Sequence, residues 1–206
     1  MTPGVALDRG LGEMALALPA GAHERLLEYV ALLVKWNRTY NLTAIRDPLA
    51  MVAHHLLDSL SVLPHLPLSA EHARLADVGS GAGLPGIPIA IARPRWHVAL
   101  AESSQKKAAF LRQAAIELSL DNVEVQEGRV QAWRPQPLFD LVISRAFAAL
   151  AEFIAACRHL LAPGGTLAAM RGVAPQELQA GCSLIALQVP LLDAQRHLVL
   201  CPASSL

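Results

Sequence analysis

A short apolar run that ends in an acid and leads directly into closely spaced glycines constrains this chain more than any other stretch. Residues 74–78 read Arg-Leu-Ala-Asp-Val, and the apolar segment 87–92 follows after glycines at positions 79, 81, 83 and 86. Glycine lets the backbone turn sharply and lets a ligand approach with no Cβ in the way. The stretch therefore predicts a strand, a tight turn and a helix start, whose free N–H groups favour a bound ligand.

The glycine spacing leaves three readings of this turn open. Segment 81–86 matches the dinucleotide pattern G-x-G-x-x-G. A dinucleotide fingerprint should begin where the strand ends, however, and from Gly79 the spacing reads G-x-G-x-G. The acid Asp77 and the glycines at every second position resemble motif I of methyltransferases, which bind S-adenosyl-L-methionine. A tight turn that binds no ligand is the third reading.

Composition bounds the class of protein. The chain has 206 residues, of which 53% are hydrophobic and 17% charged, with a net charge of zero. This length fits one large domain or a domain with an extension, and the low charge argues against disorder. Overall charge predicts binding to neither nucleic acid nor membrane, so any basic surface must be local. We find no leader of the secretory type and no apolar run of about 18 residues, and we expect no membrane span.

The cysteines carry little information. Cys157, Cys182 and Cys201 are odd in number, far apart and without a C-x-x-C pattern. Such spacing indicates neither a disulfide framework nor a zinc site.

Residues 1–68 are predicted to form a helical extension in front of a domain at residues 69–206. Apolar residues recur at helical spacing within this extension, and Asp47-Pro48 combines a favoured N-cap with proline at the first helical position. The expected helices cover 11–18, 22–38 and 48–63.

From residue 74 onward, strands alternate with helices, which favours a mostly parallel sheet covered on both faces. Strands are expected at 74–78, 97–102, 122–126, 139–144, 165–170, 184–190 and 197–202. Helices are expected at 85–92, 104–119, 148–161 and 175–181. The connection between the last two strands is too short for a parallel crossover, so they should pair antiparallel. An α/β fold with a seven-stranded sheet and a terminal antiparallel hairpin is the class I methyltransferase arrangement.

A series of short motifs, in this order and spacing, resembles the glucose-inhibited division protein B family over residues 24–202. The motifs are Lys35-Trp36-Asn37, Tyr40-Asn41-Leu42-Thr43, Arg46-Asp47-Pro48, His55-Leu-Leu-Asp58-Ser59, residues 77–88, Ser144-Arg145-Ala146-Phe147 and Arg196-His197. The resemblance implies a cytoplasmic bacterial enzyme that uses S-adenosyl-L-methionine to methylate N7 of a guanine in small-subunit (16S) ribosomal RNA. Its partner would be that RNA or the ribosomal subunit, with no membrane, and we expect a monomer. Gln131, where an acid is common, and Arg171, where lysine is usual, depart from the family pattern.

The expected cofactor site gathers the glycine turn and the ends of the next strands. Glu102 follows the turn by about twenty residues, where an acid can accept both ribose hydroxyls; an exposed strand-end carboxylate is the alternative. Val130 lies in the segment that meets adenine in the family, with core packing as its alternative. The residues assigned to the cofactor are Asp77, Gly79, Ser80, Gly81, Gly83, Leu84, Glu102, Val130, Gln131 and Arg145.

Arginines are the residues expected to act on the RNA. Arg145 ends a strand, where ligands bind in such sheets, while Arg129 and Arg196 match family arginines near the RNA or the cofactor. Guanine N7 has a lone pair and carries no proton, so no general base is needed, and catalysis should rest on proximity and electrostatics. Solvent-exposed positions are the alternative for these arginines, as for Lys106, Lys107 and Arg112. His54, His55 and Asp58 could be mistaken for metal ligands, but we expect helix capping, exposed polar positions or substrate contact rather than a metal.

Other functions make different demands on the sequence. A small-molecule methyltransferase would share the cofactor site but need no basic helical extension. A nicotinamide-dependent dehydrogenase would need the other glycine phase and a catalytic donor. A non-catalytic nucleotide-binding module would need only the pocket.

Overall fold

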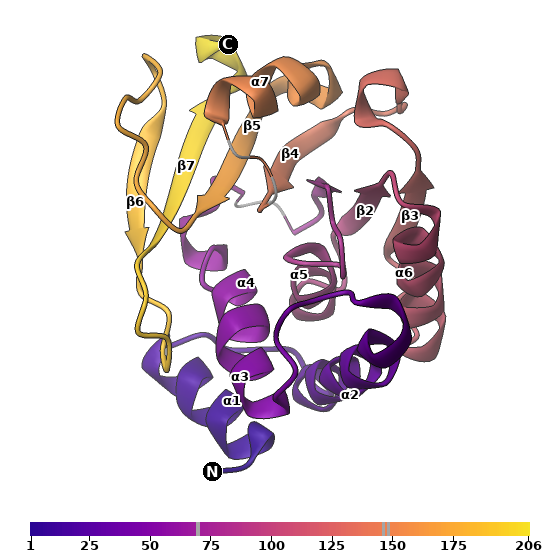
Figure 1. Cartoon of the computed structure of the whole chain (residues 1–206). Helices are drawn as coiled ribbons and strands as arrows, with labels where there is room; N and C mark the ends of the chain where they lie inside the picture. Colours follow the sequence, from indigo (N-terminus) through magenta and orange to yellow (C-terminus); the bar gives the residue numbers. More distant parts are fainter. Residues whose placement is uncertain (69–70, 146, 148) are drawn as a thin grey trace.

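Seven strands form one sheet in the order β3-β2-β1-β4-β5-β7-β6 (Figure 1). The structure is a computed structural model that describes residues 1–68, 71–145, 147 and 149–206. The strands are β1 (Arg74–Val78), β2 (His97–Glu102), β3 (Val123–Glu127), β4 (Phe139–Ser144), β5 (Leu161–Arg171), β6 (Ser183–Leu187) and β7 (Arg196–Pro202). The first five pair in parallel, whereas β7 pairs antiparallel with both β5 and β6. The expected class I methyltransferase fold is confirmed.

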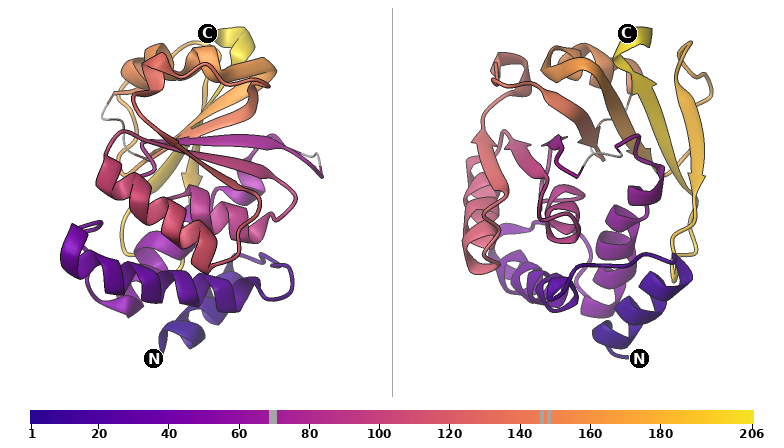
Figure 2. Two further views of the ribbon diagram at one scale, coloured as in Figure 1. Left: turned by 90° about the vertical axis from the view of Figure 1, so that its right-hand side faces the viewer. Right: turned by 180° about the vertical axis from the view of Figure 1, so that it is seen from behind.

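Alternating side chains of the strands serve two separate hydrophobic layers. Leu75 and Leu100 point into a core shared with α5 (Gly86–Ala92), α6 (Gln105–Glu117) and α2 (Ala22–Tyr40). Ala76 and Ala101 point into a smaller core with α7 (Leu150–Cys157). The left panel of Figure 2 shows the resulting three layers, with the sheet between α7 and the other helices. Because β1, β2 and β4 are buried on both faces, their sequences are almost continuously apolar, whereas the edge strands β3 and β6 are partly exposed.

The N-terminal helices complete the larger layer. They are α1 (Pro3–Glu13), α2, α3 (Pro48–Met51), a π-helical stretch over Val52–Leu57 and α4 (Asp58–Leu60). The predicted start at Asp47 is confirmed, since its carboxylate accepts hydrogen bonds from the N–H groups of Leu49 and Ala50 at 3.4 and 3.0 Å. The predicted helix 48–63 is interrupted by the π-helical stretch, and the apolar stripe it carries is buried.

Several predicted boundaries were wrong. The first helix spans Pro3–Glu13 rather than 11–18, because Thr2 caps it and Pro3 occupies its first turn. No helix forms over 175–181. Strand β5 begins earlier than predicted and β6 ends at Leu187. Two predicted positions lie outside the described residues: the start of helix 148–161 and position 146 of the Ser144–Phe147 motif. The helix ends at Cys157 rather than at 161, and a 3-10 turn follows it.

The reading of the cysteines was also wrong. Cys182 and Cys201 form a disulfide across β6 and β7, with Cα atoms 4.3 Å apart, while Cys157 is buried and free. The two cysteines are 19 residues apart in the sequence, but the antiparallel register brings them together. It places Ser183 opposite Leu200, and the cysteines are the next residues on either side of that pair.

The remaining short elements are 3-10 helices over Leu63–His65, Val130–Ala132, Arg158–Leu160 and Ala203–Ser205. Within the described ranges, none of the helices has both the length and the apolar character required to cross a bilayer.

Candidate functional site

The turn after β1 takes the shape that its glycines permit. Gly79, Gly81 and Gly83 have φ values of 72°, 59° and 91°, a region that side chains with a Cβ rarely adopt. A Cβ on Gly86 would collide with the side chain of Leu100 and lie 2.8 Å from an Asp77 carboxylate oxygen. The turn therefore needs glycine for its backbone shape and for close packing at the start of α5.

Two buried carboxylates hold this turn in place. Asp77 Oδ2 accepts a hydrogen bond of 2.9 Å from the N–H of Gly86. Glu102 Oε2 accepts one of 2.9 Å from Gly81, and its Oε1 accepts one of 2.7 Å from Ser104. Burial raises the pKa of Asp77 to about 7, although the Gly86 N–H and the nearby Arg145 oppose this rise. Asp77 and Glu102 thus brace the turn from beneath.

Two cavities meet at Gly79, which lines both. The strand-end cavity, of about 410 Å³, lies at the carboxyl ends of β1, β2 and β3. The turn cavity, of about 240 Å³, lies over the glycine turn and receives Lys107 from α6 and Arg145 from the end of β4. The strand-end cavity is lined by Val78, Gly79, Ala101, Ser103, Gly128, Arg129, Val130, Gln131 and Phe147. The turn cavity is lined by Leu42, Thr43, Gly79, Ser80, Gly81, Ala82, Leu84, Lys107 and Arg145. Together they form an elongated site with an apolar end and a cationic end.

A third space, the arginine cavity, adjoins the turn cavity and shares Thr43 and Arg145 with it. Its volume is about 390 Å³. Its polar lining comprises Thr43, His54, His55, Asp58, Arg145, Arg171, Arg196 and His197. The N-terminal helices thus supply one wall, and the ends of β4, β5 and β7 supply the other.

The histidines of the arginine cavity differ in their surroundings. His55 is 4% exposed and shares a 2.9 Å hydrogen bond with the Thr43 hydroxyl. Burial, together with the positive charge of Arg145, lowers its pKa to about 4, so the ring is neutral at pH 7. His197 Nδ1 is buried and has no hydrogen-bond partner in the described part of the chain, which leaves an unpaired polar atom at the wall of this cavity.

The structure separates the predicted site residues into three groups. Gly79, Ser80, Gly81, Leu84, Val130, Gln131 and Arg145 line the two cavities at the turn. Asp77, Gly83 and Glu102 do not line them; Asp77 and Glu102 bind the backbone of the turn, and Gly83 packs against Ile87. Arg145 and Arg196 meet in the arginine cavity, whereas Arg129 lies at the strand-end cavity.

The alternatives weighed for Val130, Arg112 and Lys107 also have structural outcomes. Val130 lines the strand-end cavity and is also part of the smaller core. Arg112 is paired with Glu127 at 2.9 Å on the surface, which agrees with the reading of a solvated helix face. Lys107 reaches the turn cavity.

Asp58 is the main functional candidate to which the sequence assigned no definite role. Its carboxylate is 1% exposed and binds both Arg145 and Arg196. A sequence signal did exist, because an acid directly follows the apolar positions 56 and 57 of a stripe that must be buried. Thr43, Phe147 and His197, which also line these cavities, belong to the quoted motifs but were not assigned a role.

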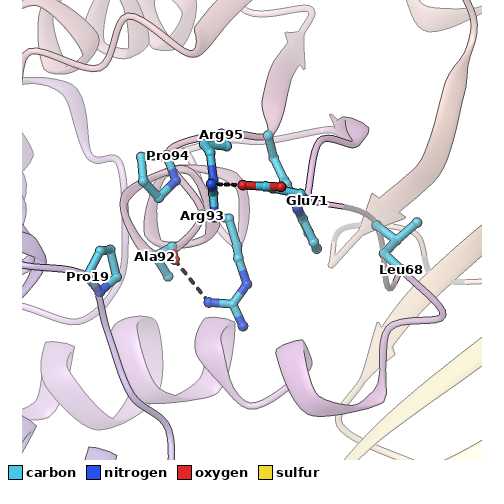
Figure 3. A pocket seen from close by; sticks show the side chains of 8 residues that line it. Pro19, Leu68, Glu71, Ala92, Arg93, Pro94 and Arg95 are labelled. Atoms are coloured by element: carbon cyan, nitrogen blue, oxygen red, sulfur yellow. Dashed lines mark hydrogen bonds and ion pairs between the residues drawn. The ribbon is translucent and has the colours of Figure 1, made fainter.

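Another cavity, of about 400 Å³, lies at the opposite end of the strands (Figure 3). Arg95 is paired with Glu71 there, and the guanidinium of Arg93 donates to the carbonyl of Ala92 at 3.0 Å. Ligands of open α/β sheets bind beyond the carboxyl ends of the strands. This cavity borders the residues that precede β1 and β2, so we do not assign the site to it.

Comparisons with known proteins agree on one group. The family model described as GidB, rRNA small subunit methyltransferase G, matches residues 22–197. A protein named ribosomal RNA small subunit methyltransferase G from Methylobacillus flagellatus is 52% identical over 202 residues, covering 96% of this chain and 97% of its own. A protein of the same name from Chromobacterium violaceum is also 52% identical, covering 94% of each chain. Among solved structures, a SAM-dependent methyltransferase from Aquifex aeolicus aligns with a TM-score of 0.58 at 16% identity, over 79% of this chain and 97% of that one.

Proposed function

Because this chain belongs to the GidB family of rRNA small subunit methyltransferase G, we propose that it transfers a methyl group from S-adenosyl-L-methionine to N7 of one guanine in small-subunit 16S ribosomal RNA. The single observation that supports this most is the junction of three cavities at Gly79, Thr43 and Arg145. The strand-end and turn cavities would hold the two ends of the cofactor, and the adjoining arginine cavity would hold the target base. We place this reaction in the bacterial cytoplasm, on a monomer.

The two cavities at the turn fit S-adenosyl-L-methionine. The strand-end cavity offers Val130, Gln131 and Phe147 to an adenine, and the turn cavity offers Lys107 and Arg145 to a carboxylate. Asp77 Oδ1 is buried and has no hydrogen-bond partner among the described residues. Asp77 lies beneath the turn, however, and lines neither of the two cavities. When bound, the cofactor supplies a methyl group on a sulfonium. Gly79, Ser80 and Gly81 would hold its middle, and Glu102, which keeps the turn in shape, would accept the ribose hydroxyls with the remaining lone pairs of its carboxylate.

The chemistry of guanine N7 fits the groups around the arginine cavity. N7 attacks the methyl carbon with its own lone pair, so no proton has to be removed before the reaction. His55 is neutral and bonded to Thr43, and Asp58 is engaged by two guanidinium groups. The residues of the arginine cavity therefore need only to position the base and to provide a suitable electrostatic field around it.

We assign Arg145 and Arg196 to the target base and Arg129 to the RNA backbone. An arginine that holds both O6 and N7, as in major-groove readout, would block the methyl transfer. A contact with O6 alone is compatible with it, and the position of Arg145 between the turn cavity and the arginine cavity suits this contact. Arg129 is exposed at the mouth of the strand-end cavity, where a phosphate can reach it.

The proposal is tested with the purified protein, methyl-labelled cofactor and small-subunit RNA that lacks the modification. Naked 16S RNA, an assembly intermediate and the complete subunit form three parallel substrates. We expect mass spectrometry of the digested RNA to find 7-methylguanosine at one position, in at least one substrate. Label on another base or on ribosomal protein would contradict the N7 assignment, and no transfer to any of the three would contradict the RNA assignment.

A further inference from the structure

One buried carboxylate holds both arginines of the arginine cavity. Asp58 Oδ2 accepts a hydrogen bond of 3.0 Å from Arg145 Nη1, and Asp58 Oδ1 accepts one of 3.0 Å from Arg196 Nε. The side chain of Asp58 is 2% exposed, against 29% for Arg145 and 22% for Arg196. The carboxylate is therefore almost wholly buried at the wall of the cavity, whereas the two guanidinium groups are partly exposed.

The three side chains come from separate parts of the fold. Asp58 begins α4, Arg145 follows β4, and Arg196 begins β7. Arg145 Nη1 also donates to the carbonyl of His54 at 3.1 Å, so the segment 54–58 holds it at two points. The N-terminal helices consequently help to set the geometry of both arginines, while Arg196 Nη1 also donates to the carbonyl of its neighbour Gln195 at 2.8 Å.

An arginine without such a partner has a long side chain with many accessible rotamers, and ordering it costs conformational entropy. A guanidinium has five N–H donors in a rigid planar fork. Each arginine can therefore bind Asp58 and still donate to a ligand. Since the ordering cost is met in the folded protein, it does not reduce the rate of transfer.

Charge is the second reason why a carboxylate is needed here. The N7 lone pair forms the new N–C bond, and the electrons of the broken C–S bond return to sulfur. The positive charge thereby moves from the sulfonium to the base, and no proton is released. Arg145, Arg171 and Arg196 all line the cavity that would receive this charge, and Asp58 is the one acid in its described lining. Unbalanced guanidinium charges within a few ångströms would oppose the transfer.

We propose that Asp58 is a positioning residue for methyl transfer: it fixes the guanidinium groups of Arg145 and Arg196 at the base site and offsets their charge where the base becomes cationic. This inference rests on the function proposed above. It assigns a role to a residue that contacts neither the cofactor nor the base directly.

The test uses Asp58→Asn, with Asp140→Asn as the matched control. Asp140 lies at the other end of β4, where its carboxylate accepts a 2.8 Å hydrogen bond from the N–H of Arg74. For Asp58→Asn we expect the single-turnover rate at saturating RNA and cofactor to fall by about 10- to 100-fold. The dissociation constant for RNA should stay the same or decrease, because the cavity has gained one positive charge. Asp140→Asn should change neither quantity by more than about twofold.

A lower rate of transfer combined with unchanged or tighter RNA binding distinguishes a positioning role from a general structural role. A damaged site would lose RNA affinity and rate together, and that result would overturn the proposal. A double-mutant cycle with Arg196→Gln provides a second measurement: if Asp58 acts through Arg196, the double variant should lose less than the product of the two single losses. Independent, multiplying losses would contradict it. If Asp58→Asn does not fold, Asp58→Glu replaces it in the rate and binding measurements and in the double-mutant cycle. The double variant Asp58→Asn/Arg196→Gln, which has the same net charge as the wild type, is then measured beside it.

A readout without RNA keeps this inference distinct from the proposed function. In the ¹⁵N spectrum of the free protein, the Nε–H group of Arg196 should exchange slowly with water in the wild type and fast in the Asp58 variant. Equal exchange in both would refute the positioning role, whether or not the enzyme methylates RNA. Failure of the wild type to methylate guanine, with the exchange difference present, would refute the proposed function alone.

Discussion

The hydroxyl of Tyr29 donates a 2.6 Å hydrogen bond to the carbonyl oxygen of Ala82, 53 residues further along the chain. Tyr29 lies in the middle of α2 and is fully buried, and Ala82 lies in the glycine turn. Burial strongly raises the pKa of Tyr29, so its hydroxyl remains a donor. An N-terminal helix therefore helps to hold the loop on which the cofactor would lie.

Replacing Tyr29 by Phe should leave the Ala82 carbonyl buried and unpaired. We expect a loss of about 1–3 kcal/mol in the free energy of unfolding and weaker binding of S-adenosyl-L-methionine. Chemical denaturation and calorimetry measure the two effects. Tyr40→Phe is the control, because Tyr40 is 40% exposed. Equal stabilities of the two variants would show that the Tyr29 bond does not hold the turn.

Replacing Glu102 by Gln should weaken cofactor binding. Its carboxylate accepts hydrogen bonds from Gly81 and Ser104, and an amide can accept only at one of its two ends. We expect a loss of about 1–3 kcal/mol in binding free energy by calorimetry. Glu124→Gln, on the neighbouring strand, is the control. Tight binding of NAD in place of S-adenosyl-L-methionine by the wild type would contradict the whole assignment of the turn.

The pKa of Asp77, about 7 when folded against 3.8 for the unperturbed group, gives a signed prediction. Between these values the folded state binds more protons than the unfolded state, so the free energy of unfolding should fall as pH rises from about 4 to 7. The slope is about 1.4 kcal/mol per pH unit. Arg145 opposes the shift and Glu102 adds to it.

Asp77→Asn should remove this contribution, so we expect the stability difference between variant and wild type to change with pH across that window. Comparing the two proteins also cancels the opposite trend of His55, whose pKa is lowered. Asp121→Asn, at an exposed position, should leave the pH profile unchanged. A difference that stays constant from pH 4 to 7 would count against a buried, protonated Asp77.

RNA binding should depend on salt through a few local cations, because the net charge of the chain is zero. If Arg129 contacts a phosphate, Arg129→Ala should reduce the slope of log K against log salt by about 0.7 for single-stranded RNA. Filter binding over a salt series measures this slope. Arg112→Ala is the control, because Arg112 is paired with Glu127. An unchanged slope in Arg129→Ala would remove Arg129 from the RNA surface.

Deleting residues 1–68 should expose the larger core and abolish methylation. Leu26, Leu33 and Leu56 are fully buried in the core that also holds Leu75 and Ile87. We propose 1–68 and 69–206 as the units of the chain, with the first dependent on the second for its burial. Solubility, circular dichroism and the methylation assay test the truncated chain; a soluble and active product would contradict this dependence.

The sequence predicted those elements whose ends carry local signals. Strands β1, β2 and β4 matched their predicted ranges because an apolar run meets glycine or a polar segment at each end. Asp47-Pro48 marked a helix start for the same reason. The range predicted for the first helix was wrong because three glycines weaken its helical pattern, although Thr2-Pro3 is a start signal.

Contacts between distant residues were beyond the reach of such signals. Asp58 meets partners 87 and 138 residues away, and no local pattern encodes which arginines they are. The Cys182–Cys201 pair depends on the register of β6 and β7, which spacing alone does not specify. The glycine turn was predicted, but the role of Glu102 in bracing it follows from three-dimensional geometry.

The shared core of the N-terminal helices and the sheet affects how this chain is made. Helix α2 leaves the ribosome first, yet its buried face packs on α5 and α6, which are translated later. Until those helices emerge, the part of the α2 surface that packs on them stays uncovered, although α1 and α3 contact α2 elsewhere. Exposed apolar surface of this kind favours aggregation and chaperone binding. Early nascent chains of this protein should therefore require protection during synthesis, and the cofactor loop takes its final shape only after the strand that carries Glu102 has been added.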